Sequence, residues 1–337
     1  MVDEDHLIRH IASVIPSFAG NKGLQAGVPI GIGDDAMVIH NGGKKDLVVT
    51  VDAFLEGVHF LPDRHPAESV GYKALARATS DVAAMGARPA YFLLTLALPK
   101  SRAGRWLDGM LGGMSVAAQS LGLRLVGGDT TRSSLISMSI TVIGKIAPGR
   151  AVTRAGAKFG DTIFISGTLG RAQLGLELVQ NGMAKNPRIS ELLGPHFFPR
   201  IRLDLGAWLA GHGVASAMMD ISDGVSTDLA RLCAASRVAA RIYQHRIPCV
   251  KIPPRLRCLK GFGHLSDPLN MALHGGEDYE LLFTVPKKML KKLQRAPGAK
   301  DLHAIGEIDR GHDILLVSET GQTRMLKPHG WDPFRRK

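Results

Sequence analysis

The sequence predicts a two-domain α/β protein in which helices are layered against mixed sheets. Short apolar segments of β character alternate with segments of helical periodicity along 337 residues, and the Gly-, Pro- and Arg-containing stretch "APGRAVTRAGAKFGD" interrupts this alternation. A chain of this length exceeds one ordinary core and suits two domains of roughly 150 residues each. We therefore expect an N-terminal domain over residues 1–148 and a C-terminal domain over residues 149–337.

The N-terminal half predicts a helix over residues 5–15 and then two strands, Gly31–His40 and Asp46–Asp52, joined by "NGGKKD". The Asn-Gly pair in that link is typical of a tight hairpin. Pro66 begins a helix to about Met85, whose apolar residues recur at nearly helical spacing. The remaining predicted elements are a strand over 90–98, a helix over 102–121 and strands over 123–126 and 135–146.

The C-terminal half continues the same alternation, which indicates a second α/β layer structure. The predicted strands cover residues 162–166, 216–221, 279–285, 304–308 and 313–317. The predicted helices cover residues 169–181, 199–211 and 224–235.

Composition and cysteine content indicate a globular, cytoplasmic protein. Apolar residues make up 45% of the chain, but no apolar run approaches the ~20 residues of a membrane helix. The N-terminus is charged from its third residue, unlike a secretory signal. Cys233, Cys249 and Cys258 form no CxxC pair and no even disulfide set, which favours a reduced compartment.

The formal net charge of +12 suggests anionic partners. Lysines and arginines are scattered, however, and the aromatic residues, only 5% of the chain, do not interleave with them. A stacking surface for single-stranded nucleic acid is therefore not predicted. Phosphate-bearing metabolites remain as partners, and neither nucleic acid nor membrane is expected.

Carboxylates recur at strand ends and on Gly-rich turns, in "GIGDD", "VTVDAF", "VGGDTT", "MDISDG" and "HGGED". Strand ends are where α/β proteins bind ligands, and a neighbouring glycine lets an anion or metal approach the backbone. Asp81 lies instead in the helical stretch "ATSDVAAMG". Carboxylates that converge need cations between them, and Mg²⁺ suits both carboxylate and phosphate oxygens. The alternative is that each aspartate caps a turn or helix, but five such turns favour a shared metal site.

Other motifs limit how a nucleotide could bind. "GIGDDA" fits the dinucleotide pattern GxGxxA, but a strand is expected to follow where that fold needs a helix. No P-loop is present, so phosphates would be bound without a Walker lysine. Arg154 and Lys158 are candidate phosphate contacts, with surface charge the favoured interpretation for Lys158. No HxH or HExxH zinc motif occurs.

Nearly the whole chain resembles the thiamine-monophosphate kinase family. That family belongs to the superfamily of ATP-dependent aminoimidazole ribonucleotide synthetase and selenophosphate synthetase. The resemblance rests on "GIGDDAMVI", "VTVDAFLEGVHF", "YKALARATSDVAAMGARP", "GGDTTRS", "TRAGAKFGD", "MDISDGVSTDL", "GGEDYELLFTVP" and the terminal "GWD". It implies direct in-line transfer of the γ-phosphoryl group of ATP to thiamine monophosphate, giving thiamine diphosphate. The nucleophile would be a phosphate oxygen that is already anionic, so no strong general base is required.

The resemblance also implies residue roles. It implies Mg²⁺ ligands at Asp34, Thr50, Val51 (through its carbonyl), Asp52, Asp81, Asp129, Asp220 and Asp223. Those with a part in the reaction itself are Asp34, Asp81, Asp129 and Asp223. The implied ATP contacts are Asp129, Arg154 and Ser222, and the implied contacts with thiamine monophosphate are His59, Glu277 and Trp331. It further implies a homodimer whose N-terminal domains pack together through their mixed sheets.

Two questions remain open in the sequence. The chain could be another ATP-dependent synthetase of the superfamily, or a non-catalytic dimer that binds Mg²⁺ and nucleotide. Within "GIGDD", neighbouring side chains of an extended segment point to opposite faces. We therefore expect Asp34 to face the metal cluster and Asp35 to hydrogen-bond local backbone or support the site.

Overall fold

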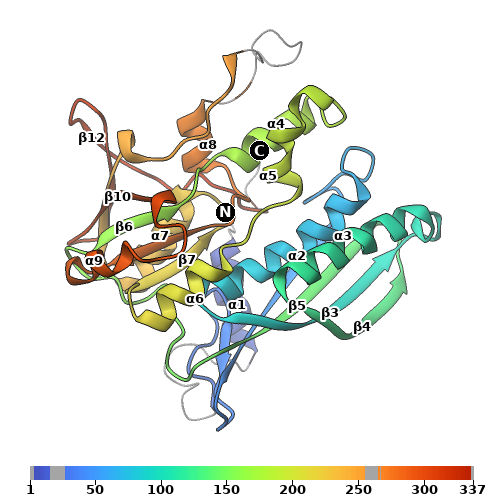
Figure 1. The fold of residues 1–337 in the computed structure, drawn as a ribbon, viewed down its shortest axis with the longest axis horizontal. Helices are drawn as coiled ribbons and strands as arrows, with labels where there is room; N and C mark the ends of the chain where they lie inside the picture. The colour runs from blue at the N-terminus through green and yellow to red at the C-terminus, as the bar shows by residue number, and fades with distance from the viewer. Residues whose placement is uncertain (1–3, 16–26, 255–264, 266, 335–337) are drawn as a thin grey trace.

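A computed structural model of the chain describes residues 4–15, 27–254, 265 and 267–334, and it contains two sheets (Figure 1). The first is mixed and has the strand order β1-β2-β5-β3-β4, in which β3 and β4 are parallel and the other pairs antiparallel. Its strands are β1 (Met37–Ile39), β2 (Asp46–Leu55), β3 (Arg88–Leu98), β4 (Arg124–Arg132) and β5 (Ser137–Ile146). This confirms the predicted mixed sheet and the hairpin between β1 and β2.

Two antiparallel helices, α2 (Ala67–Ala84) and α3 (Arg105–Leu121), cover one face of this sheet (Figure 1). The side chains of β5 alternate between buried and half-buried, so only one face of that strand lies in the core. On β4 every residue is exposed, and on β2 the side chain of Val51 is 65% exposed. The other face of the sheet is therefore open within the described chain.

The second sheet has seven strands in the order β12-β11-β8-β10-β6-β9-β7. Its strands are β6 (Thr162–Ser166), β7 (Ala217–Ile221), β8 (Ala239–Tyr243), β9 (Glu280–Val285), β10 (Leu302–Asp309), β11 (Ile314–Val317) and β12 (Thr323–Met325). The other α-helices are α1 (Glu4–Val14), α4 (Arg171–Gln180), α5 (Ser190–Phe197), α6 (Leu203–His212), α7 (Val225–Ser236), α8 (Pro268–His274) and α9 (Leu290–Leu293). Short 3-10 helices cover 100–102, 187–189, 244–246, 287–289 and 299–301.

One hydrophobic core joins the two sheets. A single cluster of buried side chains contains Val82 of α2, Leu209 of α6 and Phe283 of β9. Helices α2 and α6 pack so closely that a Cβ on Gly206 would lie 2.1 Å from the carbonyl oxygen of Ala83. The first sheet ends at Ile146 and the second begins at Thr162, while the domain boundary near Pro148 stays a prediction.

The predicted strand Gly31–His40 is wrong over its first part. Only Met37–Ile39 forms a strand, and residues 31–36 form a turn with isolated bridges. Gly33 has φ +115°, a backbone conformation that residues with a Cβ rarely adopt, and it bends the chain away from extension. Helices α5, α8 and α9 and strands β8 and β12 were not predicted, because they are short and carry little periodicity. In the described part of the chain, no helix combines the length and apolar character needed to cross a membrane.

Gly112 and Gly113 of α3 provide a matched test of the packing against α2. A Cβ on Gly113 would lie 1.8 Å from the carbonyl oxygen of Glu68, whereas one on Gly112 would meet nothing within 4 Å. We expect Gly113→Ala to lower the free energy of unfolding by about 1–3 kcal/mol, because the helices must separate. Gly112→Ala should raise it by roughly 0.5–1 kcal/mol through helix propensity. Urea denaturation measures both, and equal effects would contradict the helix contact.

Candidate functional site

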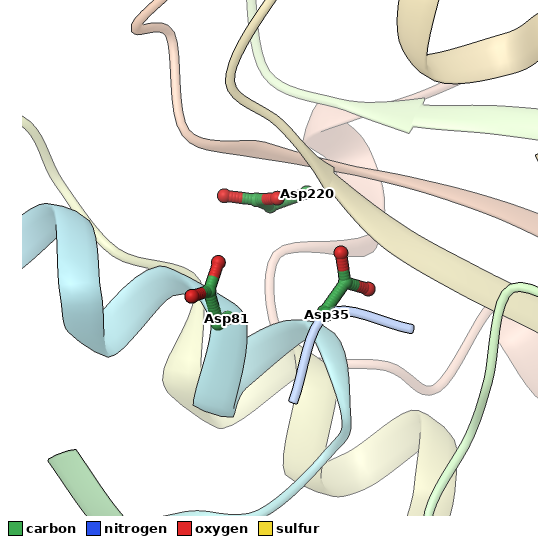
Figure 2. A group of neighbouring side chains, drawn as sticks. All are labelled: Asp35, Asp81 and Asp220. Atoms are coloured by element: carbon green, nitrogen blue, oxygen red, sulfur yellow. The ribbon is translucent and has the colours of Figure 1, made fainter. Parts of the chain in front are cut away.

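Three carboxylates from distant parts of the chain meet where the two sheets join. Asp35 comes from the turn before β1, Asp81 from α2 and Asp220 from β7, and one oxygen of each lies within 4.8 Å of the others. Figure 2 shows the three side chains facing a common space between these segments. Asp35 and Asp220 are buried, at 8% and 2% exposed, and Asp81 is half-buried. We call this group the carboxylate cluster.

Hydrogen bonds from neighbouring elements hold each member of the carboxylate cluster. The Thr50 hydroxyl of β2 donates to Asp81 Oδ2 at 2.6 Å. The Ser80 hydroxyl of α2 donates to Asp220 Oδ2, also at 2.6 Å. Because Ser80 and Asp81 are adjacent on α2, that helix positions two of the three carboxylates.

Among the described residues, Arg154 is the cation that contacts the carboxylate cluster directly. Its Nη2 and Nε donate to Asp35 Oδ1 at 2.7 and 3.1 Å. Arg154 lies in the link between the two sheets. The sequence predicts that it contacts a phosphate, and in this structure its guanidinium forms an ion pair with Asp35.

Burial and mutual repulsion disfavour three charges in the carboxylate cluster. Burial, together with the charge of Asp35, raises the pKa of Asp220 to about 7. Burial followed by the charges of Asp220 and Asp52 raises the pKa of Asp81 well above its usual range. The pKa of Asp35 is also raised by burial, although Arg154 opposes the shift. The site would be relieved of this cost by a bound cation.

The donor set fits a hard divalent cation. Asp35 Oδ2 is buried and has no hydrogen-bond partner in the described chain, although buried carboxylate oxygens are normally paired. Mg²⁺ would bind this unpartnered oxygen, and its charge would also stabilise the ionised forms of the two neighbouring carboxylates, whose pKa values are raised. The residues present therefore fit the metal that the sequence predicts.

The structure reverses the expected arrangement of Asp34 and Asp35. The Asp34 carboxylate accepts the backbone N–H of Asp35 at 3.0 Å and that of Arg154 at 3.2 Å, while Asp35 joins the carboxylate cluster. The expectation that Asp34 faces the cluster was wrong because it assumed an extended segment, and Gly33 turns the chain here. Burial and the adjacent Asp35 charge raise the pKa of Asp34 to about 7.

Asp52 and Asp129 lie outside the carboxylate cluster in the described chain. Asp52 is bound by Arg77 of α2, whose Nε and Nη2 donate to its two oxygens at 2.6 and 3.1 Å. Asp129 is exposed on β4 and pairs with Thr95 of β3. The ladder from β2 through β5 and β3 to β4 separates it from Asp52 by three strand spacings, or roughly 14 Å.

Asp223 belongs to a second acidic group that already contains a cation. Arg231 of α7 donates to Asp223 and lies 3.5 Å from Asp228 Oδ1 and 3.2 Å from Glu4 Oε2 of α1. This guanidinium neutralises carboxylates from two helices and the turn after β7. In the carboxylate cluster, by contrast, the one arginine found in the described chain bonds only Asp35 and leaves Asp81 and Asp220 without a cationic partner.

The expected substrate residues His59 and Glu277 lie within electrostatic reach of each other. Burial and the Arg77 charge lower the pKa of His59 to about 4, although the Glu277 charge opposes this. The His59 ring stacks on Phe54 at a centroid distance of 5.4 Å, and its Nδ1 accepts the Leu55 N–H at 3.0 Å. His59 is therefore neutral near pH 7.

The turn Ser222–Asp223 anchors the other expected ligand contacts. The Ser222 carbonyl accepts the Glu277 N–H at 2.8 Å, and the Asp223 carbonyl accepts the Trp331 N–H at 3.0 Å. The Trp331 side chain is 42% exposed. Consecutive carbonyls thus hold both Glu277 and Trp331 beside the end of β7.

The remaining predicted residues have simpler surroundings. The side chain of Val51 is apolar and largely exposed, so only its carbonyl could bind a metal. Lys158 is exposed. Asp278 accepts the N–H groups of Gly170 and Ala172 at 2.6 and 3.0 Å and so caps the first turn of α4.

Sequence reasoning missed Lys73, Arg77 and Arg231. A signal for the first two was present, because Lys73, Arg77 and Asp81 recur every four residues on a predicted helix and therefore share one face. For Arg231 the sequence offered only the spacing to Asp228, three residues earlier on α7, since its other partners lie on α1 and in the turn after β7.

Known proteins are similar to this chain over nearly its whole length. Residues 33–146 match the family described as AIR synthase related protein, N-terminal domain, and residues 158–317 match the corresponding C-terminal domain. The chain is 39% identical to the thiamine-monophosphate kinase of Salmonella typhimurium, over 91% of this chain and 92% of that protein. Its identity to the Escherichia coli K12 enzyme is 36%, with the same two coverages.

A solved structure is similar as well. The structure described as AaThiL complexed with AMPPCP and TMP has a TM-score of 0.81 and 32% identity, covering 98% of this chain and 97% of that one. Both the sequence and the fold therefore match over at least 92% of each of these relatives. The chain belongs to the thiamine-monophosphate kinase family of the AIR synthase related proteins.

Proposed function

We propose that this protein transfers the γ-phosphoryl group of ATP to the phosphate of thiamine monophosphate, forming thiamine diphosphate and ADP. The carboxylate cluster carries the proposal, because it offers buried, under-neutralised oxygens at the junction of the two sheets. The relatives support it: they are thiamine-monophosphate kinases, and one similar structure binds AMPPCP, an ATP analogue, and TMP.

The reaction asks the protein for position and charge rather than for a strong base. The attacking oxygen belongs to a phosphate that is anionic near neutral pH, so the obstacle is repulsion between two anions. Mg²⁺, when bound, would supply the positive charge that offsets this repulsion. Asp35, Asp81 and Asp220 would hold it, with Thr50 and Ser80 fixing the carboxylate orientations through their hydroxyl donors.

Other residues are proposed for further Mg²⁺ ions and for ATP. The residues proposed to bind further Mg²⁺ ions are Asp34, Asp52, Asp223 and, through its carbonyl, Val51. The residues proposed to bind ATP are Arg154 and Ser222. Asp52 and Asp223 are held by Arg77 and Arg231. To bind a metal, each of these two carboxylates would either use an oxygen that its arginine leaves free or give up the ion pair with that arginine. Arg154 lies beside the carboxylate cluster, where a phosphate could replace Asp35 as its partner.

Thiamine monophosphate would lie toward His59, Glu277 and Trp331. Its thiazolium ring is cationic, and the Lys73 charge lowers the pKa of Glu277 to about 2 against the effect of burial, so an ionised carboxylate is available. A neutral His59 avoids repulsion with that ring, and the half-exposed Trp331 offers an aromatic face.

A homodimer and a cytoplasmic location complete the proposal. The open edge strand β4 exposes Leu125 and Val126 at 57% and 55%, a surface that a second copy could cover. Asp129 lies on the same strand and would contribute through that assembly. Cys233 and Cys249 are unpaired thiols, in keeping with a reducing compartment.

Mg²⁺ should stabilise the protein through the carboxylate cluster. A ligand at a hundred times its dissociation constant adds about 2.7 kcal/mol to the free energy of unfolding. We expect such a gain when Mg²⁺ is added to wild-type protein freed of metal by chelator, and its loss in Asp81→Asn. The exposed Asp313→Asn serves as the matched control and should keep the gain. Thermal and urea denaturation measure it, and an undiminished gain in Asp81→Asn would contradict the proposed ligand.

The activity itself is tested by product formation. Wild-type protein with ATP, Mg²⁺ and thiamine monophosphate should form thiamine diphosphate and ADP in equal amounts, as measured by chromatography. Asp81→Asn should lower kcat by at least roughly 10²–10³, because electrostatic groups of this kind contribute that much. Its metal-free stability should not fall, since one repelling charge is removed. ATP hydrolysis without thiamine diphosphate, across a range of Mg²⁺ concentrations, would overturn the proposal.

A further inference from the structure

A buried lysine stands behind Glu277. Lys73 of α2 is 2% exposed, and its Nζ lies 2.6 Å from Glu277 Oε2 and 3.3 Å from His196 Nδ1 of α5. Lysine is seldom buried unless it is paired. The pair joins the helix of the first half to the turn before β9, across 204 positions of sequence.

The hydrogen bonds behind Lys73 run in one direction. Lys73 can only donate, so His196 Nδ1 accepts and the proton of that ring lies on Nε2. This Nε2–H then donates to His65 Nε2 at 3.1 Å. His65 Nδ1 lies 3.1 Å from both the N–H and the carbonyl oxygen of Leu61, and because His65 Nε2 accepts, Nδ1 carries the proton and donates to that carbonyl. Burial and the Lys73 charge lower the pKa of His65 to about 4 and that of His196 well below its usual range. Both rings are therefore neutral supports, and Lys73 is the cation of this chain of contacts.

Glu277 is held so that one oxygen remains available. Lys73 occupies Oε2, while Oε1 has no hydrogen-bond partner in the described chain, and the side chain is 22% exposed. The backbone is fixed as well, with φ +66° at Glu277 and +49° at Tyr279, values that are uncommon for residues other than glycine. Such a backbone persists only where its surroundings impose it, and such sites are often functional.

Helix α2 connects this carboxylate to the carboxylate cluster. Lys73, Arg77 and Asp81 lie on one face of the helix, where Arg77 binds Asp52 and Asp81 belongs to the cluster. Eight residues of helix span roughly 12 Å, so Lys73 stands one substrate length away from the proposed metal. An acceptor with an anionic phosphate at one end and a cationic ring at the other matches this order of charges.

We propose that Lys73 is a positioning residue for the phosphoryl acceptor: by binding Oε2 it orients Glu277, so that Oε1 faces the cationic ring of thiamine monophosphate. The inference rests on the proposed function. His196 and His65 hold the lysine from behind, and Lys73 itself touches no substrate.

A double-mutant cycle tests the role. We compare wild type with Lys73→Met, Glu277→Gln and the double variant, and use the exposed Lys300→Met as a matched control. Each single variant should raise KM for thiamine monophosphate roughly tenfold, through loss of an oriented charge–charge contact, and leave KM for ATP within about twofold. Because both residues act through one contact, the double variant should be no worse than Glu277→Gln alone.

Two further features keep the test decisive. If Lys73→Met alone fails to fold because it leaves a buried charge unpaired, the double variant removes both charges and still reports on the acceptor site. Lys73→Arg retains a positive charge, so its KM for thiamine monophosphate should lie between that of the wild type and that of Lys73→Met.

The opposing results are distinct from each other. Losses that multiply in the double variant, or equal rises of KM for both substrates in Lys73→Met, would overturn the positioning role. A wild-type protein that forms no thiamine diphosphate would instead overturn the proposed function on which the role rests.

Discussion

Carboxylates repel one another, and this protein brings three of them together in a largely buried space where, in the described chain, one arginine contacts them. Asp35, Asp81 and Asp220 come from three segments that are distant in the sequence, so the two halves of the chain must be joined correctly for them to meet. The continuous core beneath them provides that joining. Hydrophobic packing therefore sustains an electrostatic arrangement that would be unfavourable by itself, as expected where binding rather than stability has selected the residues.

Helix α2 positions most of the charged residues of the proposed site. One side of α2 packs against α3 at the distance that Gly71 and Gly113 permit, and Lys73, Arg77 and Asp81 follow one another at four-residue spacing along the helix. This series runs from the carboxylate proposed for the cationic ring to the carboxylates proposed for metal. A rigid helix is well suited to fix these two ends of a substrate at a constant separation.

Much of the fold was predictable from the sequence, and the site was predictable in outline. Alternating periodicities gave most strands and long helices, and the Gly-flanked aspartates indicated the acidic site. The orientation of Asp34 and Asp35 was not predictable, because it depends on one positive φ at Gly33. The partner of Lys73 was not predictable either, since only the folded chain brings Glu277 to α2 across 204 positions. Local patterns reveal which residues are chemical, but tertiary packing decides which of them meet.

The occupancy of the carboxylate cluster is tested most directly by diffraction from crystals grown with Mn²⁺ as a stand-in for Mg²⁺ and with an ATP analogue. Anomalous scattering at the manganese edge locates the ion independently of the refined coordinates. We expect a peak bonded to one oxygen each of Asp35, Asp81 and Asp220, including the presently unpartnered Asp35 Oδ2. Peaks elsewhere on the protein, with these three carboxylates left without an ion, would contradict the cluster as the metal site.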